Sequence, residues 1–227
     1  MMMALLLVLG APLSVPAAGT EFMYSGWTER VKGIVEVSAS LRARGNYEEA
    51  GRKLDSLDLA EHDDPDGYAA LAVSGANYAL GLALFQIADY PGAVHRLGLA
   101  DDLDSANVKI LYALGNAYRR AGRLSDARRS FDAAIAIDGT VATAHCNLGN
   151  TYYAMKEYSL AGESYAKSLD LDPDHVASHY MAGRVAWRRR HVVDAIAASR
   201  MVLELDPEHA KAKSQLLQAA QWLAETG

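Results

Sequence analysis

Apolar and small residues recur three and four positions apart along most of this chain, a spacing that places them on one face of an α-helix. The stretch 108–137 is a clear example, because its apolar positions fall into two groups separated by a polar turn. The groups are Leu111, Leu114, Ala117 and Tyr118, then Ala127, Phe131, Ala134 and Ile135. Each group predicts one amphipathic helix, and since no strand is predicted, we expect an all-α protein.

The same arrangement repeats with a period of 34 residues. Residues at equivalent positions of successive repeats form columns. The most regular column is glycine; an alanine column lies twelve positions later, and a third column lies four positions after the alanine. The three columns are Gly81, Gly115, Gly149 and Gly183; Ala93, Ala127, Ala161 and Ala195; and Leu97, Phe131, Tyr165 and Ser199. A register kept across several columns indicates an internal structural repeat.

Each repeat is predicted to be a helical hairpin. The glycine and alanine columns carry little or no side chain, so two helices can approach closely there. An aspartate followed by serine, glycine or proline near the end of each unit ends one helix and caps the free N–H groups of the next. A single hairpin cannot bury both of its faces, whereas stacked hairpins can, and the period therefore predicts a solenoid.

These columns resemble the tetratricopeptide repeat. The matching positions are Leu114, Gly115, Tyr118, Ala127, Phe131 and Ala134 in one unit, and Leu148, Gly149, Tyr152, Ala161, Tyr165 and Pro173 in the next. The resemblance implies a right-handed α-solenoid of stacked antiparallel helical hairpins with a polar C-terminal capping helix. It also implies that the first helix of each hairpin lines a concave groove.

The repeat divides most of the chain into units. Regular repeats are expected at 74–107, 108–141, 142–175 and 176–209, with a capping helix at 208–227. A degenerate first hairpin at 28–73 has helices at 28–44 and 47–59 and an acidic insertion at 61–67, and the next helix is expected at 72–88. Residues 18–27 are a linker. We interpret the insertion as a solvated loop rather than a calcium site, because its last ligand position holds Val73.

Residues 1–17 form an apolar segment without a charged side chain. The run 4–15 is too short to cross a bilayer as a helix, and the small residues around Ala17 suit a signal peptidase. The segment therefore resembles a secretory signal peptide and predicts a periplasmic or secreted protein. The alternative is an uncleaved apolar segment on a membrane-anchored or cytoplasmic protein, in which case this segment alone contacts the membrane.

Charge and composition exclude several function classes. The chain has 22 Lys and Arg against 28 Asp and Glu, a net charge of −6, so nucleic-acid binding is not expected. Its single cysteine, Cys146, excludes an intrachain disulfide and a cysteine-based zinc cluster. His175 and His179 have a metal-like spacing, but packing or capping roles are favoured. No catalytic motif is found, so we expect no enzyme, no metal and no cofactor.

The groove is the candidate site for a partner protein. Polar and aromatic residues of the expected first helices, chosen by helical spacing within the implied groove, are Tyr112, Asn116, Arg120, Asn147, Asn150, Tyr153, Tyr180, Arg184, Trp187 and Arg188. The capping helix adds Lys211, Gln215 and Gln218. Asparagine amides can pair with an extended peptide backbone, and arginines among aromatic rings suit an acidic or aromatic segment. The competing interpretation is that the arginines are solvated at helix C-termini, where positive charge is favoured.

Some relatives hold the C-terminal carboxylate of heat-shock chaperones with a clamp of two lysines, two asparagines and one arginine. Asn116 and Asn147 match its asparagines, but Tyr112, Ala177 and Met181 stand where its cations belong. That ligand is therefore not predicted.

The leading hypothesis is a non-enzymatic scaffold or adaptor that binds an extended peptide or partner segment in its concave groove. The alternative is a self-associating structural subunit of an envelope or secretion assembly. Its homo-oligomer would form through apolar residues of the first hairpin: Trp27, Val31, Ile34, Val35 and Leu41.

Overall fold

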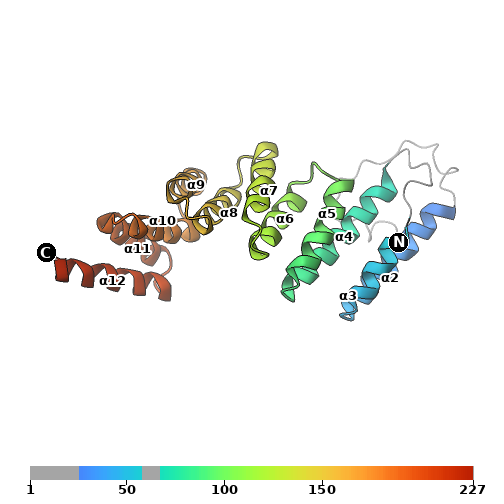
Figure 1. Ribbon diagram of the computed structural model, residues 1–227, viewed down its shortest axis with the longest axis horizontal. Helices are drawn as coiled ribbons and strands as arrows, with labels where there is room; N and C mark the ends of the chain where they lie inside the picture. Colours follow the sequence, from blue (N-terminus) through green and yellow to red (C-terminus); the bar gives the residue numbers. More distant parts are fainter. Residues whose placement is uncertain (1–25, 58–66, 227) are drawn as a thin grey trace. The chain divides into compact units, whose positions relative to one another are not determined.

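The computed structural model describes residues 26–57 and 67–226, and every regular element within them is helical (Figure 1). The chain divides into two compact units, one ending at Ala117 and the other beginning at Tyr118. The helices are α2 (Gly26–Ala43), α3 (Tyr47–Asp55), α4 (Tyr68–Gln86), α5 (Tyr90–Leu103), α6 (Val108–Arg120), α7 (Leu124–Ile137), α8 (Ala142–Ala154), α9 (Tyr158–Leu171), α10 (Val176–Arg188), α11 (Val192–Leu205) and α12 (Ala210–Thr226).

Helices adjacent in sequence pack as antiparallel hairpins, and the hairpins stack within each unit. In the first unit α2 pairs with α3 and α4 with α5, and α4 packs against both α2 and α3. In the second unit α8 pairs with α9 and α10 with α11, while α9 packs against α10 and α12 covers α11. The predicted all-α solenoid of stacked hairpins is thereby confirmed. The expected segment 1–17, residues 18–25 of the expected linker 18–27 and the acidic insertion up to residue 66 lie outside the described residues. The last two residues of that linker belong to α2, which begins at Gly26.

The glycine column marks the closest approach of the two helices in a hairpin. A Cβ atom added to Gly81 would lie 2.7 Å from Cγ of Leu97, and one added to Gly149 would lie 2.6 Å from Cε1 of Tyr165. In each case the partner is the residue sixteen positions later, and both partners are fully buried. Glycine is therefore required at these positions, because the large side chain of the opposite helix occupies the space that a Cβ atom would need.

In the last repeat the glycine faces a side chain from a different helix. Its partner position holds Ser199, which is too short to fill the space and whose hydroxyl donates to the carbonyl of Ala195 instead. A Cβ on Gly183 would lie 2.8 Å from Nε2 of Gln215, a residue of α12. The side chain of the covering helix thus occupies the place that Tyr165 and Leu97 fill in their own hairpins.

The first hairpin contradicts one part of the self-association hypothesis. Val31 is 0% and Val35 is 6% exposed, so both are core residues rather than surface. They are buried because α2 packs against α4 as well as α3. Ile34 and Leu41 are half-buried, and the side chain of Trp27 lies outside the described residues.

One buried arginine joins the first hairpin to the next. Arg96 of α5 donates from Nη1 to Oδ1 of Asp55 over 2.6 Å and from Nη2 to Oδ2 over 2.9 Å. The Arg96 side chain is only 12% exposed, and its guanidinium lies directly against Gly51 of α3. These hydrogen bonds lower the pKa of Asp55 and outweigh the partial burial that raises it.

Arg96→Ala is expected to lower the free energy of unfolding by about 1–2 kcal/mol at neutral pH. Hydrogen bonds between charged groups stabilise a fold more than neutral ones do, but solvent screens this pair because Asp55 is half exposed. Because the pKa of Asp55 is lowered in the folded state, the ion pair stabilises the fold fully at a pH above the ordinary aspartate pKa of about 3.9. This stabilisation is lost as the pH falls through the pKa that Asp55 has in the folded protein. Urea unfolding of both proteins should therefore converge in acid. The control Arg52→Ala removes an exposed 3.8 Å pair with Glu48 and should change little; equal effects of both substitutions would contradict the assignment.

Helix α4 is the most apolar element. Within the described residues one stretch, Ala69–Gln86, is long and apolar enough to cross a membrane by length and composition, with 39% of it buried. It packs against α2, α3 and α5. These contacts account for its composition as that of the core helix of the first unit.

Candidate functional site

Eight of the predicted groove residues, five from the first helices of hairpins and three from the capping helix, line one pocket in the second unit. Tyr153 comes from the end of α8, and α10 supplies the residues that its helical spacing places on one face. Helix α12 closes the pocket on the other side. The pocket measures about 330 Å³ and is lined by Tyr153, Tyr180, Arg184, Trp187, Arg188, Lys211, Ser214, Gln215 and Gln218. We call it the α8–α10–α12 pocket.

Two tyrosines position the guanidinium of Arg184. Its Cζ lies 4.8 Å from the ring centre of Tyr153 and 6.0 Å from that of Tyr180. The Tyr180 ring is in turn packed against His209, with centroids 5.2 Å apart. Cation–π contacts of this kind hold the guanidinium beside the rings, and one of its N–H groups, Nη1, donates to Sδ of Met181 over 3.9 Å.

A second arginine is held by the same tyrosine. Nε of Arg188 donates to the hydroxyl of Tyr153 over 3.2 Å, and the Tyr153 ring packs edge-on against Tyr158 at 5.4 Å. With Lys211, the pocket lining carries three cations and no carboxylate. The pocket is therefore electropositive in a chain of net charge −6.

Gln215 adds an unusual polar group to this lining. The residue is 9% exposed, and neither its amide nitrogen nor its amide oxygen has a hydrogen-bond partner among the described residues. An unpaired buried amide costs about 1–3 kcal/mol, so an apolar residue would suit a purely structural cap better. Sequence spacing indicates that Gln215 belongs to the groove, but only the packing against Gly183 reveals that its amide is buried.

Asn147 and Asn150, which were predicted to bind a peptide backbone, instead form hydrogen bonds within the protein. The Tyr165 hydroxyl donates to Oδ1 of Asn150 over 2.9 Å, and Nδ2 of Asn150 donates to Oδ1 of Asn147 over 3.3 Å. Burial raises the pKa of Tyr165, which keeps its hydroxyl protonated as the donor. The two amides therefore form a network with the core tyrosine, and neither lines the α8–α10–α12 pocket.

The remaining predicted residues lie on α6. Tyr112 and Asn116 belong to the first unit, where Nδ2 of Asn116 donates to the carbonyl of Tyr112 within the same helix over 3.1 Å. Arg120 is the exposed last residue of α6 and belongs to the second unit. The lining of the α8–α10–α12 pocket includes none of the three.

Comparison with protein families identifies the repeat. One family model, described as TPR repeat, matches residues 115–156, and another, described as Tetratricopeptide repeat, matches residues 142–175. The chain contains tetratricopeptide repeats. The two matches together span α7, α8 and α9, so the family assignment covers the middle of the array and includes the Tyr165–Gly149 contact.

Solved tetratricopeptide-repeat structures share the fold. The MamA protein is 21% identical with a TM-score of 0.66, covering 81% of this chain and 96% of MamA. YrrB, a TPR protein with an unusual peptide-binding site, is 16% identical with a TM-score of 0.63, covering 83% and 96%. The first TPR of Spaghetti (RPAP3), bound to the HSP90 peptide SRMEEVD, is 20% identical with a TM-score of 0.51, covering 52% and 93%. Comparison with curated proteins gave no match.

Three histidines and the cysteine of the second unit make structural contacts. The His175 side chain caps α10 by accepting from the backbone N–H of Ser178. Nε2 of His145 lies 3.1 Å from the carbonyl of Gly139, and Nε2 of His179 lies 2.7 Å from that of Pro173. Burial raises the pKa of Cys146, which disfavours a reactive thiolate. Residues 26–57 and 67–226 contain no group of three potential metal ligands.

Proposed function

We propose that this protein is a non-enzymatic tetratricopeptide-repeat scaffold that binds an extended segment of a partner protein in the α8–α10–α12 pocket. The single observation that carries the proposal is the pocket itself, in which Arg184 and Arg188 are held by Tyr153 beside an unpaired buried amide. Groups that are positioned before a ligand arrives reduce the entropy lost on binding.

The chemistry of the pocket favours an acidic segment with an aromatic side chain. Arg184, Arg188 and Lys211 supply charge-assisted hydrogen bonds to carboxylates. Trp187 and Tyr180 provide half-buried rings for an apolar or aromatic neighbour. The amide of Gln215 can both donate and accept, so it suits the backbone of an extended chain.

Two structural neighbours support a peptide ligand. RPAP3 is seen with a heat-shock peptide that contains two glutamates and one aspartate, and YrrB is described by its peptide-binding site. The pocket proposed here uses its own residues, because the chaperone clamp lacks its cations in this sequence, with Tyr112, Ala177 and Met181 in their places. We therefore place the ligand against α12 rather than across α6.

Arg184→Ala and Trp187→Ala are each expected to weaken partner binding by about tenfold or more, because both side chains line the pocket and buried Arg and Trp contacts often dominate binding energy. The measurement uses a photo-crosslinking amino acid at Gln218 to trap partners in the native cell, followed by quantitative mass spectrometry. The control Arg200→Ala removes the same charge from an exposed position of α11 outside the pocket. Equal recovery of every trapped protein from all variants, with an intact helical spectrum, would falsify this function.

We also propose that the scaffold acts outside the cytoplasm, in the periplasm or as a secreted protein within an envelope assembly. The apolar composition of residues 1–17 supports export. N-terminal sequencing of the protein from its native cell tests it: a new terminus near residue 18 supports cleavage, and an intact Met1 contradicts it.

A further inference from the structure

The turns of the second unit gather at two opposite edges. At one end of the hairpin stack, Oγ1 of Thr143 at the start of α8 lies 3.5 Å from Nε2 of His175 at the start of α10. At the other end, where the same two helices finish, the hydroxyl of Tyr153 lies 3.2 Å from Nε of Arg188. Since α8 and α10 run in the same direction, the turns that follow them share one edge and the turns that precede them share the other.

The two edges carry opposite charge. We define the basic edge as the turns 119–123, 154–157 and 188–191, and the acidic edge as the turns 137–141, 170–175 and 204–209. The basic edge has seven cations and one anion: Arg119, Arg120, Arg123, Lys156, Arg188, Arg189, Arg190 and Glu157. The acidic edge has seven anions and no Lys or Arg: Asp138, Asp170, Asp172, Asp174, Glu204, Asp206 and Glu208.

Helix dipoles do not explain this separation. Every turn joins the C-terminus of one helix, which favours positive charge, to the N-terminus of the next, which favours negative charge. Dipole stabilisation would therefore mix both signs at both edges. Asp170 and Glu204 even lie in the last turns of α9 and α11, where a negative charge is unfavourable. The competing interpretation explains the arginines at helix ends, and capping explains Asp138, Asp172 and Asp206, which accept from backbone N–H groups two residues later. Neither explains Asp170 and Glu204.

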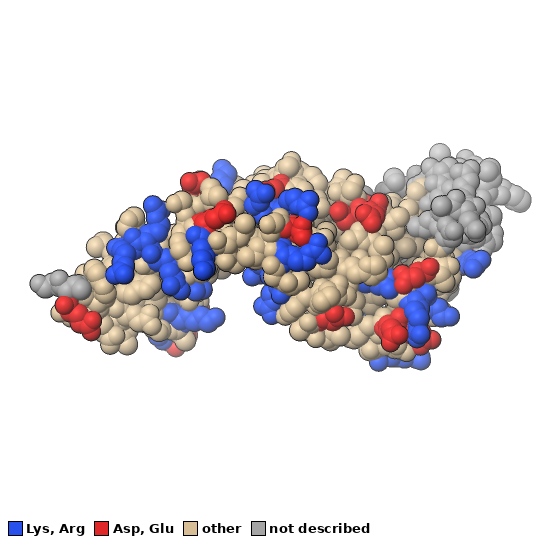
Figure 2. Space-filling view, viewed as in Figure 1, with Lys and Arg blue, Asp and Glu red and all other residues tan. Residues whose placement is uncertain are grey.

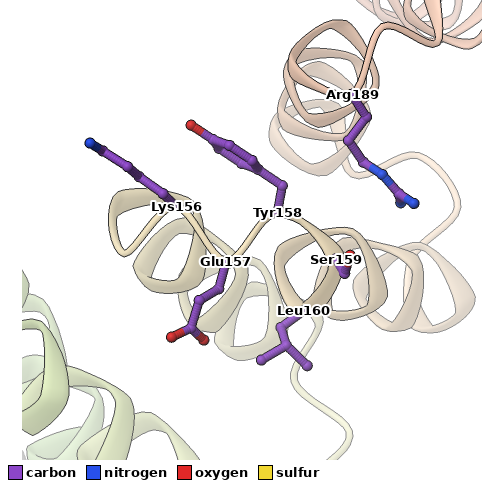
Figure 3. Close-up of a pocket in the computed structure, with 6 residues that line it drawn as sticks. All are labelled: Lys156, Glu157, Tyr158, Ser159, Leu160 and Arg189. Carbon is purple, nitrogen blue, oxygen red and sulfur yellow. The ribbon is translucent and has the colours of Figure 1, made fainter.

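A shallow surface depression also lies at the basic edge. A hollow of about 470 Å³ lies between the α8–α9 turn and the end of α10, lined by Lys156, Glu157, Tyr158, Ser159, Leu160 and Arg189. Figure 3 shows Lys156 and Arg189 on two successive turns, on either side of Tyr158, with the Lys156 side chain extending away from Arg189. Figure 2 shows Lys and Arg side chains gathered on one face of the part of the molecule around α10.

Internal ion pairs neutralise only part of either edge. Arg123 pairs with Asp126 at 2.7 Å, and Glu208 pairs with Lys213 at 3.0 Å. Lys156, Arg189 and Arg190 are exposed and form no ion pair within the part of the chain that the structure describes. On the acidic edge Asp170, Asp174 and Glu204 are equally exposed.

From this complementarity we propose that the basic edge binds the acidic edge of a second copy of the same chain. In this contact the turn with the exposed residues Pro173 and Asp174 of one copy packs against the hollow beside Lys156 and Arg189 of the next. Single exposed ion pairs contribute little, but several in register act together. Because the two edges are different surfaces, the contact is head-to-tail and continues into a chain or closes into a ring. Of the basic edge, only Arg188 also lines the α8–α10–α12 pocket.

Sedimentation velocity at micromolar protein concentrations tests the proposal. At about 20 mM salt, where charges act over about 20 Å, the wild type is expected to form dimers and larger species. At about 1 M salt, where the range falls to about 3 Å, it should be monomeric. Self-association that is absent at low salt, or that is insensitive to salt, would overturn the proposal.

A charge exchange makes the test specific. Variant one is Lys156→Glu/Arg189→Glu/Arg190→Glu, which spares Arg188, and variant two is Asp170→Lys/Asp174→Lys/Glu204→Lys, which spares the turn-capping aspartates. Each alone should associate at least about tenfold more weakly than the wild type, because one edge loses most of its net charge. Variant one leaves four cations and four anions on the basic edge, and variant two leaves four anions and three cations on the acidic edge. An equimolar mixture should recover association in hetero-oligomers. A mixture that stays monomeric while both variants keep wild-type helicity overturns the edge pairing, and binding of wild-type monomer to anionic vesicles instead identifies a membrane surface as the partner.

Discussion

Tyr165→Ala is expected to lower the free energy of unfolding by about 3–5 kcal/mol, as for other fully buried aromatic residues. Tyr165 is 0% exposed and forms one core cluster with Cys146, Ala161 and Val185. The truncation would remove the ring that packs on Gly149 and leave a cavity between α8 and α9. The measurement is the shift of the urea midpoint followed by circular dichroism.

Tyr165→Phe separates packing from hydrogen bonding. It keeps the ring but removes the donor to Asn150, so its cost should be about 1 kcal/mol. Hydrogen exchange should show that Tyr165→Ala exposes the amides of α8 and α9 before those of α4 and α5, because hairpins in different units unfold separately in repeat proteins. A shift below about 1 kcal/mol for Tyr165→Ala would mean that the ring is not a core element.

Gly81→Val is expected to destabilise the first unit by about 3 kcal/mol. The added Cβ alone would meet Cγ of Leu97 at 2.7 Å and its backbone nitrogen at 3.3 Å, so α4 and α5 would have to separate. Overpacking of this kind typically costs about 1–3 kcal/mol, and a branched side chain lies at the upper end. The midpoint of urea unfolding measures the effect.

Gly98→Val provides the matched control on the facing helix. A Cβ at Gly98 meets no atom within 4 Å, and glycine and valine are both poor helix formers. The control should therefore stay within about 0.5 kcal/mol of the wild type. Similar losses for the two substitutions would show that helix propensity, not the contact with Leu97, determines the result.

Periodicity predicts most of the fold, and its failures have a local cause. Helix α6 was expected at 108–121 and lies at Val108–Arg120, because the repeat register supplies both of its ends. The expected helices 47–59 and 72–88 lie instead at Tyr47–Asp55 and Tyr68–Gln86. The insertion interrupts the period between them, so no column marks where α3 ends. At the start of α4, Gly67 adopts a left-handed conformation (φ 63°) that no residue pattern of the repeat predicts.

The site was predictable only where helical spacing decides which residues share a face. Tyr180, Arg184 and Trp187 are on one face of α10 and meet at one pocket. Asn150 shows the limit of the same reasoning, because its repeat position indicates the groove, but a tyrosine fifteen residues later uses its amide as an acceptor. The Arg96–Asp55 pair was not predicted either, since it joins residues 41 apart across the irregular insertion.

The replacement of an aromatic residue by Ser199 in the last repeat has a consequence for how such arrays evolve or are engineered. Gln215 fills the space above Gly183 only because the following helix is α12. Duplicating an internal unit would lengthen the solenoid but would place Tyr165-like rings over each new glycine. The number of binding pockets would therefore not rise with the number of repeats. A longer array of these modules would still have a single α8–α10–α12 pocket.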